Sequence, residues 1–256
     1  MDLVATVASL TTCALLAWPI LQSLSQGSAT HAAVPTEPVS LQGASLTGSP
    51  SAKVAILEFS DYQCPYCRQF ENETAEALRE AYVDTGQVLI AFRHFPLENI
   101  HPHALTAATA AHCAGRQDRF WDMHRGLFAD PGDPSPARIR EIAGQIGIDR
   151  PGLELCMISD AAAAVRADVS EARALGVTGT PTFLIGEVTA DGLVRVSAVL
   201  SGARRLSAFS DVIDPLLGRR RRSSLLSSLA VAGGALAVIV ILVVRRRRES
   251  AAIGAV

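Results

Sequence analysis

Lysine is almost missing from this chain of 256 residues, because Lys53 is the one lysine among 23 basic residues. Aromatic residues are also scarce, at 5%, and the formal net charge is -2. Proteins that bind nucleic acid need a basic surface with interleaved aromatic side chains, and no stretch of the sequence has that composition. We therefore do not expect nucleic acid among the partners. The sequence also has no visible internal repeat.

A second compact group of metal ligands is missing as well. The chain has five cysteines, of which Cys64 and Cys67 form a CxxC motif. A structural zinc site needs two further ligands at close spacing, typically another CxxC or an HxxxH. The other cysteines and the six histidines are scattered along the chain. We expect neither a metal ion nor another cofactor.

Residues 223–244, "SSLLSSLAVAGGALAVIVILVV", contain no charged side chain, and four arginines flank them on each side. About 20 such residues cross the hydrocarbon of a bilayer as a helix, and arginines suit the lipid headgroups. This predicts a transmembrane helix in contact with membrane lipid, followed by a basic tail at residues 245–256. A buried core helix is the alternative, but core helices of this length rarely lack a polar face.

The N-terminal residues 1–24 are also apolar, which predicts a membrane anchor or the core of a signal peptide. No basic residue precedes Lys53, which argues against a signal peptide, and we favour the anchor. Residues 25–38 are rich in Ser, Thr, Ala and Pro and predict a linker. Arginines lie on both sides of the predicted C-terminal helix, so charge alone does not orient the chain in a membrane.

The middle of the chain, residues 39–217, predicts an α/β domain. Apolar runs with β-branched residues alternate with helical patterns along this part of the sequence. We expect strands near residues 39–41, 53–59, 87–97, 180–186 and 193–202, and helices over residues 65–82 and 204–218. Between about residues 100 and 176 the pattern is helical in several pieces, which predicts a helical insertion.

The CxxC motif lies at a junction between the strand "KVAILEF" and a helix. Pro65 suits the first turn of that helix, where its missing N–H is no loss. Cys64 is then at the helix N-terminus, where free N–H groups and the helix dipole stabilise a thiolate. Cys67 lies one turn later on the same face, within reach of Cys64. These features favour a redox pair over half of a metal site or a structural disulfide.

Two further features point to the same chemistry. Glu58 is an acid inside an apolar strand. It either faces water at a strand end or edge, or is a buried carboxyl with a raised pKa that exchanges a proton with Cys67. Pro181 follows Thr180 and opens a strand, a position that suits a cis peptide bond. A cis bond would turn the Thr180 backbone toward an extended partner chain, which could then pair with it.

The segments "LEFSDYQCPYC" and "GVTGTPTF" resemble the DsbA-like branch of the thioredoxin superfamily, whose members are extracytoplasmic thiol–disulfide oxidoreductases. The segments "FRHFPL", "HPHALTAATAAHCA" and "DRFWDMHRGLF" resemble the helical insertion of that branch. The resemblance covers about residues 39–217. It implies a thioredoxin fold with a helical insertion.

The resemblance also implies roles for individual residues. Cys64 would be the exposed nucleophile, Cys67 the resolving thiol, Pro181 the cis-proline that faces them, and Glu58 the buried acid. The central pair here is Pro–Tyr, whereas the strongly oxidising founding member has Pro–His. Tyr66 carries no positive charge that could stabilise the neighbouring thiolate.

Cys113 and Cys156 lie in two of the predicted helices of the insertion. A lone cysteine in a helix is commonly an inert buried thiol, and this reading stays open for both. Leftover cysteines in exported domains are more often bonded, however, and relatives in this branch often carry a cysteine at similar places. We therefore expect a structural disulfide between Cys113 and Cys156.

Together these features predict an enzyme, a thiol–disulfide oxidoreductase held at the bacterial cytoplasmic membrane. Its catalytic domain would face the periplasm or the cell exterior and introduce disulfides into exported proteins that contain cysteines. By the resemblance, a DsbB- or VKOR-type membrane partner would reoxidise it. A reductase or isomerase of the same fold is one alternative. A module that binds client proteins without catalysis, with an incidental CxxC, is the other.

Overall fold

The computed structural model describes residues 33–129 and 134–219. Within these two ranges no helix is long and apolar enough to cross a membrane. The apolar segments predicted at residues 1–24 and 223–244, the basic tail and most of the predicted linker lie outside the described residues.

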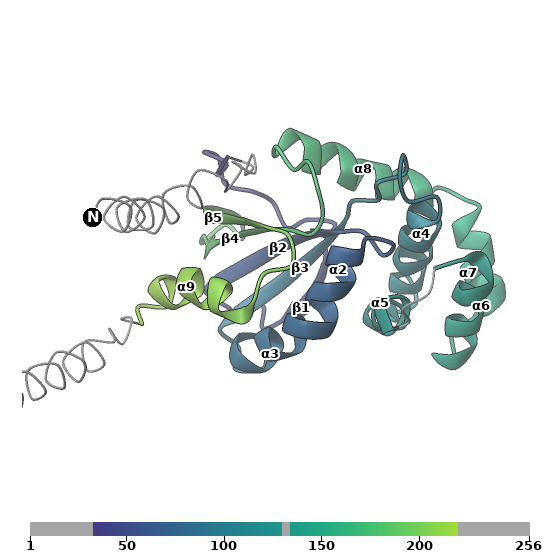
Figure 1. Ribbon diagram of the computed structural model, residues 1–256, viewed down its shortest axis with the longest axis horizontal. Coiled ribbons are helices and arrows are strands. Elements are labelled where there is room, and N and C mark those ends of the chain that lie inside the picture. Colours follow the sequence, from purple (N-terminus) through teal and green to yellow (C-terminus); the bar gives the residue numbers. More distant parts are fainter. Residues whose placement is uncertain (1–32, 130–133, 220–256) are drawn as a thin grey trace, which may run out of the picture. The chain divides into compact units, whose positions relative to one another are not determined.

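The centre of the described chain is a five-stranded sheet with the strand order β1-β3-β2-β4-β5 (Figure 1). The middle strand, β2, runs parallel to β3 and antiparallel to β4, and β1 and β5 are antiparallel edge strands. The strands are β1 (Ser45–Gly48), β2 (Val54–Ser60), β3 (Val88–His94), β4 (Thr182–Val188) and β5 (Val194–Ser201).

The prediction of a strand near residues 39–41 is wrong. Val39 forms a single bridge, in which its N–H and C=O both bond to Val194. A turn then closes with the hydrogen bond from the Ala44 N–H to the Leu41 C=O, and Gly43 takes a positive φ of 85° that suits glycine. The turn ends the pairing after one bridge, so the first true strand is β1, which pairs with β3 instead.

One long helical segment follows the CxxC motif, as the sequence predicts. It begins with α2 (Pro65–Phe70), continues through α3 (Glu76–Leu78) and ends at Val83. Two π-helical stretches, η1 (Glu71–Ala75) and η2 (Arg79–Val83), interrupt the regular α-helix. Wide turns of this kind are often found at functional sites.

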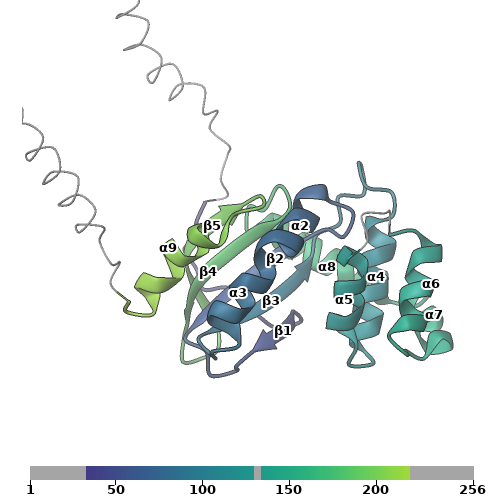
Figure 2. The same cartoon turned by 60° about the horizontal axis from the view of Figure 1, so that its bottom comes forward.

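Helices cover both faces of the sheet. Helices α2 and α3 lie on one face beside α9 (Leu206–Leu216), as Figures 1 and 2 show, and α8 (Ala161–Ala174) lies on the other. Side chains of β2 alternate between these layers. Val54 and Ile56 pack in the core beneath α2, α3 and α9, whereas Ala55, Leu57 and Phe59 pack in the core beneath α8.

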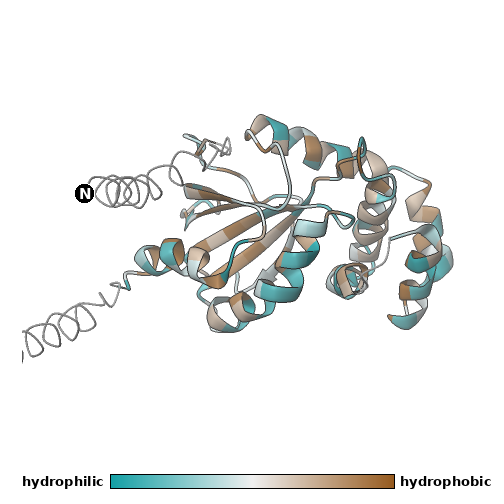
Figure 3. Ribbon diagram, in the orientation of Figure 1, coloured by the Kyte–Doolittle hydropathy of each residue, from teal (hydrophilic) through white to brown (hydrophobic). Residues whose placement is uncertain are grey.

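A block of helices stands between β3 and β4 in the sequence and packs at one end of the sheet (Figures 1 and 2). It forms its own apolar core, which also takes in Cys64 and Cys67. Figure 3 shows the strands as largely hydrophobic and the outer faces of the helices as hydrophilic, the pattern expected of amphipathic helices around a sheet. The block comprises α4 (Ala104–Gly115), α5 (Phe120–Ala129), α6 (Pro136–Gln145), α7 (Arg150–Met157) and α8.

Candidate active site

Cys64 is the N-cap residue of α2. Its backbone is extended, with φ -70° and ψ 124°, and Pro65 occupies the first helical turn. The first turn holds no acidic residue, and no side chain caps it. The N–H groups of this turn therefore point toward the cysteine end of the helix, where they favour negative charge.

Cys64 is buried, with 4% of the residue exposed, although the resemblance implies an exposed nucleophile. Cys64 is packed in the core of the helical block, and its Sγ lies 3.5 Å from the carbonyl oxygen of Thr180. The pKa of Cys64 is lowered to about 6, above all by the hydrogen bond with the Cys67 thiol. The side chain of Thr180 and the N–H groups of Cys67 and Tyr66 lower it further, while burial opposes them.

Cys67 has the opposite electrostatics. It is fully buried, and burial raises its pKa well above the ordinary value of 9.0. The interaction with Cys64 raises this pKa further, because Cys64 takes the negative charge of the pair. The N–H of Asp61 lies 3.4 Å from the Cys67 sulfur and donates to it. Both cysteines are free thiols, so the site holds one easily ionised thiol beside one that keeps its proton.

The peptide bond between Thr180 and Pro181 is cis. It precedes β4, and the Thr180 carbonyl faces Cys64. A small hollow of about 140 Å³ lies beside it, lined by residues 178–182 and by Ser201 and Gly202. A side chain at Gly179 would meet no atom within 4 Å, so the backbone there is open to an approaching chain.

Glu58 lies in the middle of β2, opposite Phe92 of β3 and Phe183 of β4. It is 4% exposed, which excludes the alternative of an edge residue that faces water. Burial raises its pKa well above 4.5, and the negative charge of Glu71 raises it further. The hydroxyl of Ser60 lowers the pKa of both Glu58 and Cys67, although it has no hydrogen-bond partner among the described residues.

Sequence reasoning missed Ser60 and Asp61. Ser60 lies two residues after Glu58 and therefore on the same face of β2. The Asp61 carboxylate accepts hydrogen bonds from the N–H groups of Gln63 and Leu97, both at 2.8 Å, and contacts His101 Nδ1 at 2.7 Å. These bonds fix the loop between β2 and α2, which positions Cys64. The bond to Gln63 is a local Asx turn, which "SDYQC" could have suggested.

Cys113 of α4 and Cys156 of α7 are joined by a disulfide of 2.08 Å, with Cα atoms 5.8 Å apart. Cys113 is fully buried in the core of the helical block, and Cys156 packs against the same core. Among residues 33–129 and 134–219 no cluster of three or more His, Cys, Asp or Glu side chains is arranged to hold a metal ion.

A family model described as thioredoxin matches residues 40–201. The chain belongs to this family. The resemblance to thioredoxins is thus confirmed, as is the α/β fold with a helical insertion.

Among solved structures, the chain is similar to Wolbachia pipientis alpha-DsbA1. The two are 26% identical, the match covers 70% of this chain and 94% of that one, and the TM-score is 0.62. The helical insertion therefore belongs to a DsbA-like form of the fold.

The chain is also similar to parts of two curated relatives with different names. A Na(+)/H(+) antiporter NhaA 1 of Salinispora arenicola is 36% identical over 64% of this chain, which spans only 24% of that relative's length. Disulfide bond formation protein D of Bacillus subtilis is 28% identical over 35% of this chain and 40% of its own length.

Proposed function

We propose that this protein is an extracytoplasmic thiol–disulfide oxidoreductase that introduces disulfides into exported proteins through Cys64 and Cys67. One observation carries the proposal: the two thiols differ in pKa, with Cys64 at about 6 and Cys67 raised above its ordinary value, at a helix N-terminus beside a cis-proline loop. A stabilised thiolate favours the reduced form of the pair, and so makes its disulfide a better oxidant.

In the oxidising direction, the reaction starts from a Cys64–Cys67 disulfide. A substrate thiolate attacks the Cys64 sulfur, a mixed disulfide forms, and Cys67 leaves with the electron pair and takes up a proton. The second substrate thiolate then attacks the substrate sulfur of the mixed disulfide, and Cys64 leaves as a thiolate. Two electrons pass to the enzyme. One substrate proton ends on Cys67, and the other goes to solvent because Cys64, with a pKa of about 6, stays ionised.

Glu58 is the group that supplies and removes the Cys67 proton in this scheme. A buried carboxyl with a raised pKa keeps its proton to higher pH than a free one and can release it to a leaving thiolate. The hydroxyl of Ser60 lowers the pKa of both groups. The backbone of Thr180, next to the open position at Gly179, would pair with the extended substrate.

The membrane setting belongs to the same proposal. The apolar segments at residues 1–24 and 223–244 would tether the catalytic domain to membrane lipid outside the cytoplasm. There it would meet cysteine-containing exported substrates and a quinone-coupled partner of the DsbB or VKOR type, which would accept its electrons. The relative named as a disulfide bond formation protein and the relative named as an antiporter support this setting.

The deciding experiment is a redox titration of the full chain in mild detergent with glutathione buffers. Alkylation and intact mass would count the free thiols at each ratio. A potential for Cys64 and Cys67 more oxidising than about -200 mV supports disulfide donation, whereas a value near about -270 mV, as in thioredoxin, indicates a reductase. A pair that never forms a disulfide would rule out redox function altogether.

A reductase or isomerase is the second candidate function. The observation that favours it is that the exposed side chain of Tyr66, between the two cysteines, carries no positive charge that would stabilise the Cys64 thiolate further. The same titration separates the two functions.

A further inference from the structure

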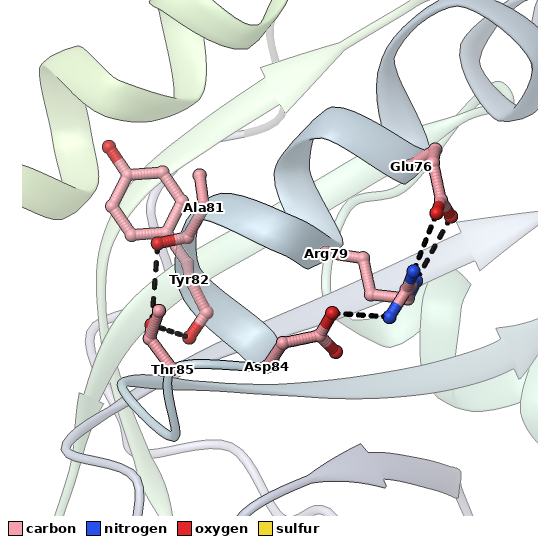
Figure 4. A network of polar contacts seen from close by, with 6 residues as sticks. All are labelled: Glu76, Arg79, Ala81, Tyr82, Asp84 and Thr85. Carbon is pink, nitrogen blue, oxygen red and sulfur yellow. Dashed lines mark hydrogen bonds and ion pairs between the residues drawn. The ribbon is translucent and has the colours of Figure 1, made fainter.

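The ion pairs of this protein lie in two kinds of place. On the outside of the helical segment that follows the cysteines, Arg79 pairs with Glu76 and Asp84 (Figure 4). Their side chains are 43% to 68% exposed, and solvent makes such pairs weak. The carboxyl of Asp61 differs from these, because its side chain is 0% exposed and stands three residues before Cys64.

The Asp61 carboxyl joins two loops. Its Oδ1 accepts a hydrogen bond from the N–H of Gln63 in its own loop, and its Oδ2 accepts one from the N–H of Leu97 in the loop between β3 and α4. The third partner is Nδ1 of His101, which lies in that second loop, 2.7 Å from Oδ2. A carboxylate only accepts hydrogen bonds, so this ring nitrogen carries the hydrogen. His101 is thus the partner that binds Asp61 through a side chain.

Main-chain bonds hold His101 in place. Its N–H donates to the carbonyl of Leu97 at 2.9 Å, and its carbonyl accepts from the N–H of Ala104, the first residue of α4, at 3.2 Å. The His101 side chain is only 14% exposed. The imidazole therefore ties the start of the helical block to the loop that precedes Cys64.

The main chain of Asp61 contacts both cysteines. Its carbonyl accepts a hydrogen bond from the N–H of Cys64 at 3.1 Å, and its N–H donates to the sulfur of Cys67 at 3.4 Å. Burial and Cys64 raise the pKa of Cys67, whereas the Ser60 hydroxyl and this N–H lower it. The N–H of Asp61 therefore favours negative charge on a sulfur that burial otherwise keeps neutral.

Negative charge reaches Cys67 during the proposed reaction. When Cys67 resolves a mixed disulfide on Cys64, it gives its proton to Glu58 and attacks the Cys64 sulfur as a thiolate. The Cys64–Cys67 bond forms, the bond from Cys64 to the bound thiol breaks, and that thiol leaves with the electron pair as a thiolate. In the opposite direction Cys67 is the leaving group and carries the same charge. A donor already aimed at its sulfur stabilises this charge without reorganisation.

We propose that the Asp61 N–H is a catalytic donor to the Cys67 thiolate, and that His101 is the positioning residue that keeps this donor aimed at the sulfur. This inference rests on the proposed redox function. Asp61 touches a reacting atom, whereas His101 acts only through Asp61. Through His101, the loop between β3 and α4 sets the rate of the step in which Cys67 attacks or leaves.

The test separates the steps of the two cysteines. Full-length protein in a Cys13→Ser background, with Cys64 and Cys67 reduced, is mixed in mild detergent with glutathione disulfide and quenched with acid at intervals. Intact mass follows the formation of the glutathione adduct on Cys64 and its loss when Cys67 attacks. Glutathione disulfide takes up the two electrons, and two glutathione thiols are released. Cys67→Ser, which cannot resolve the adduct, identifies its mass.

The variants change the bond between His101 and Asp61. His101→Leu removes the donor. His101→Asn keeps one, because the amide nitrogen of Asn, like Nδ1 of His, is attached to Cγ. Glu98→Gln is the matched control, because Glu98 is an exposed residue of the same loop and is not among the partners of the Asp61 carboxyl.

We expect His101→Leu to slow the loss of the adduct about tenfold at neutral pH, less than the roughly hundredfold cost of removing an oxyanion-hole donor, because the N–H is misdirected rather than removed. His101→Asn and Glu98→Gln should lose the adduct close to the wild-type rate. Formation of the adduct should not change in any of them, because the groups that lower the pKa of Cys64 do not include Asp61 or His101.

Equal slowing in His101→Leu and His101→Asn would show that the ring acts by packing, and would overturn the proposal. Formation and loss slowed in the same proportion, or loss at the wild-type rate in His101→Leu, would overturn it as well. If His101→Leu does not fold, His101→Gln replaces it, because its amide nitrogen lies one methylene further from the main chain. Wild-type protein that never forms an adduct would refute the proposed redox function, and the role of His101 with it.

Discussion

Cys64 and Cys67 lie three residues apart at the start of one helix, whereas Cys113 and Cys156 come from two helices of the insertion. Both pairs belong to the same apolar core, but they are in different chemical states. At the helix start, the Cys67 thiol, the Thr180 side chain and backbone N–H groups lower the pKa of Cys64, and burial raises the pKa of Cys67. In the insertion, the Cys113–Cys156 disulfide joins α4 and α7.

This difference shows that burial does not decide what a cysteine pair does. At the helix N-terminus, neighbouring groups stabilise a negative charge on Cys64. The reduced form of the pair is therefore stabilised, and its disulfide can be transferred to a substrate. The Cys113–Cys156 bond instead closes a loop with a sequence separation of 43, so its contribution is to stability. The following variants test this division.

The largest effect is expected from Cys64→Ser. Without the nucleophile, neither a mixed disulfide nor an internal one can form, and the rate of oxidation of a dithiol peptide should fall to that of the uncatalysed reaction. The double variant Cys113→Ser, Cys156→Ser should keep activity at temperatures where it remains folded. Equal loss of activity in the two proteins would show that the pairs are not functionally distinct.

The same double variant should lose stability. Removing the cross-link frees a long loop in the unfolded chain, which should lower the free energy of unfolding by about 3 to 4 kcal/mol on a loop-entropy model. Urea unfolding of the oxidised wild type and the variant would measure this. Reduction of the Cys64–Cys67 disulfide serves as the control. That disulfide closes only a short loop, so its reduction should change the free energy of unfolding through electrostatic interactions rather than through loop entropy. A change below about 1 kcal/mol would contradict the structural role.

Glu58→Gln should raise stability and slow turnover. The pKa of Glu58 is higher in the folded state than in the unfolded state. Its contribution to the free energy of unfolding is therefore complete below about pH 4.5 and is lost as the pH increases. The variant should match wild type near pH 4.5 and exceed it at pH 8 by about 1 to 3 kcal/mol, the usual cost of an unsatisfied buried polar group. Glu73→Gln, at an exposed site, should show no such trend in urea unfolding.

The smallest effect is expected from Tyr66→His. The side chain is exposed beside Cys64, so an imidazolium there can favour the thiolate. The pKa of Cys64, about 6 in the wild type, should fall, so the midpoint for its alkylation with iodoacetamide should move to lower pH. The potential should become more oxidising by about 30 mV, a tenfold change in the equilibrium with glutathione. An unchanged midpoint would mean that residue 66 does not tune the pair.

Much of the fold could be predicted from local patterns. The apolar run at residues 54–60, Pro65 at the helix start and the turn around Gly192 are signals carried by neighbouring residues, and the elements there match them. The prediction of a strand near residue 39 is wrong because a turn ends the pairing of Val39 with Val194 after one bridge. The β-propensity of the local residues does not indicate that turn.

The sequence by itself determined the CxxC motif at a strand–helix junction, the acid in the central strand and a proline suited to a cis bond, because each depends on residues close along the chain. Only the tertiary structure decided that Cys64 is buried against Thr180. It likewise decided that the Asp61 carboxyl meets His101. These contacts join residues from the loop before α2, the loop before α4 and the loop before β4, and no local pattern encodes a distance between segments so far apart in the sequence.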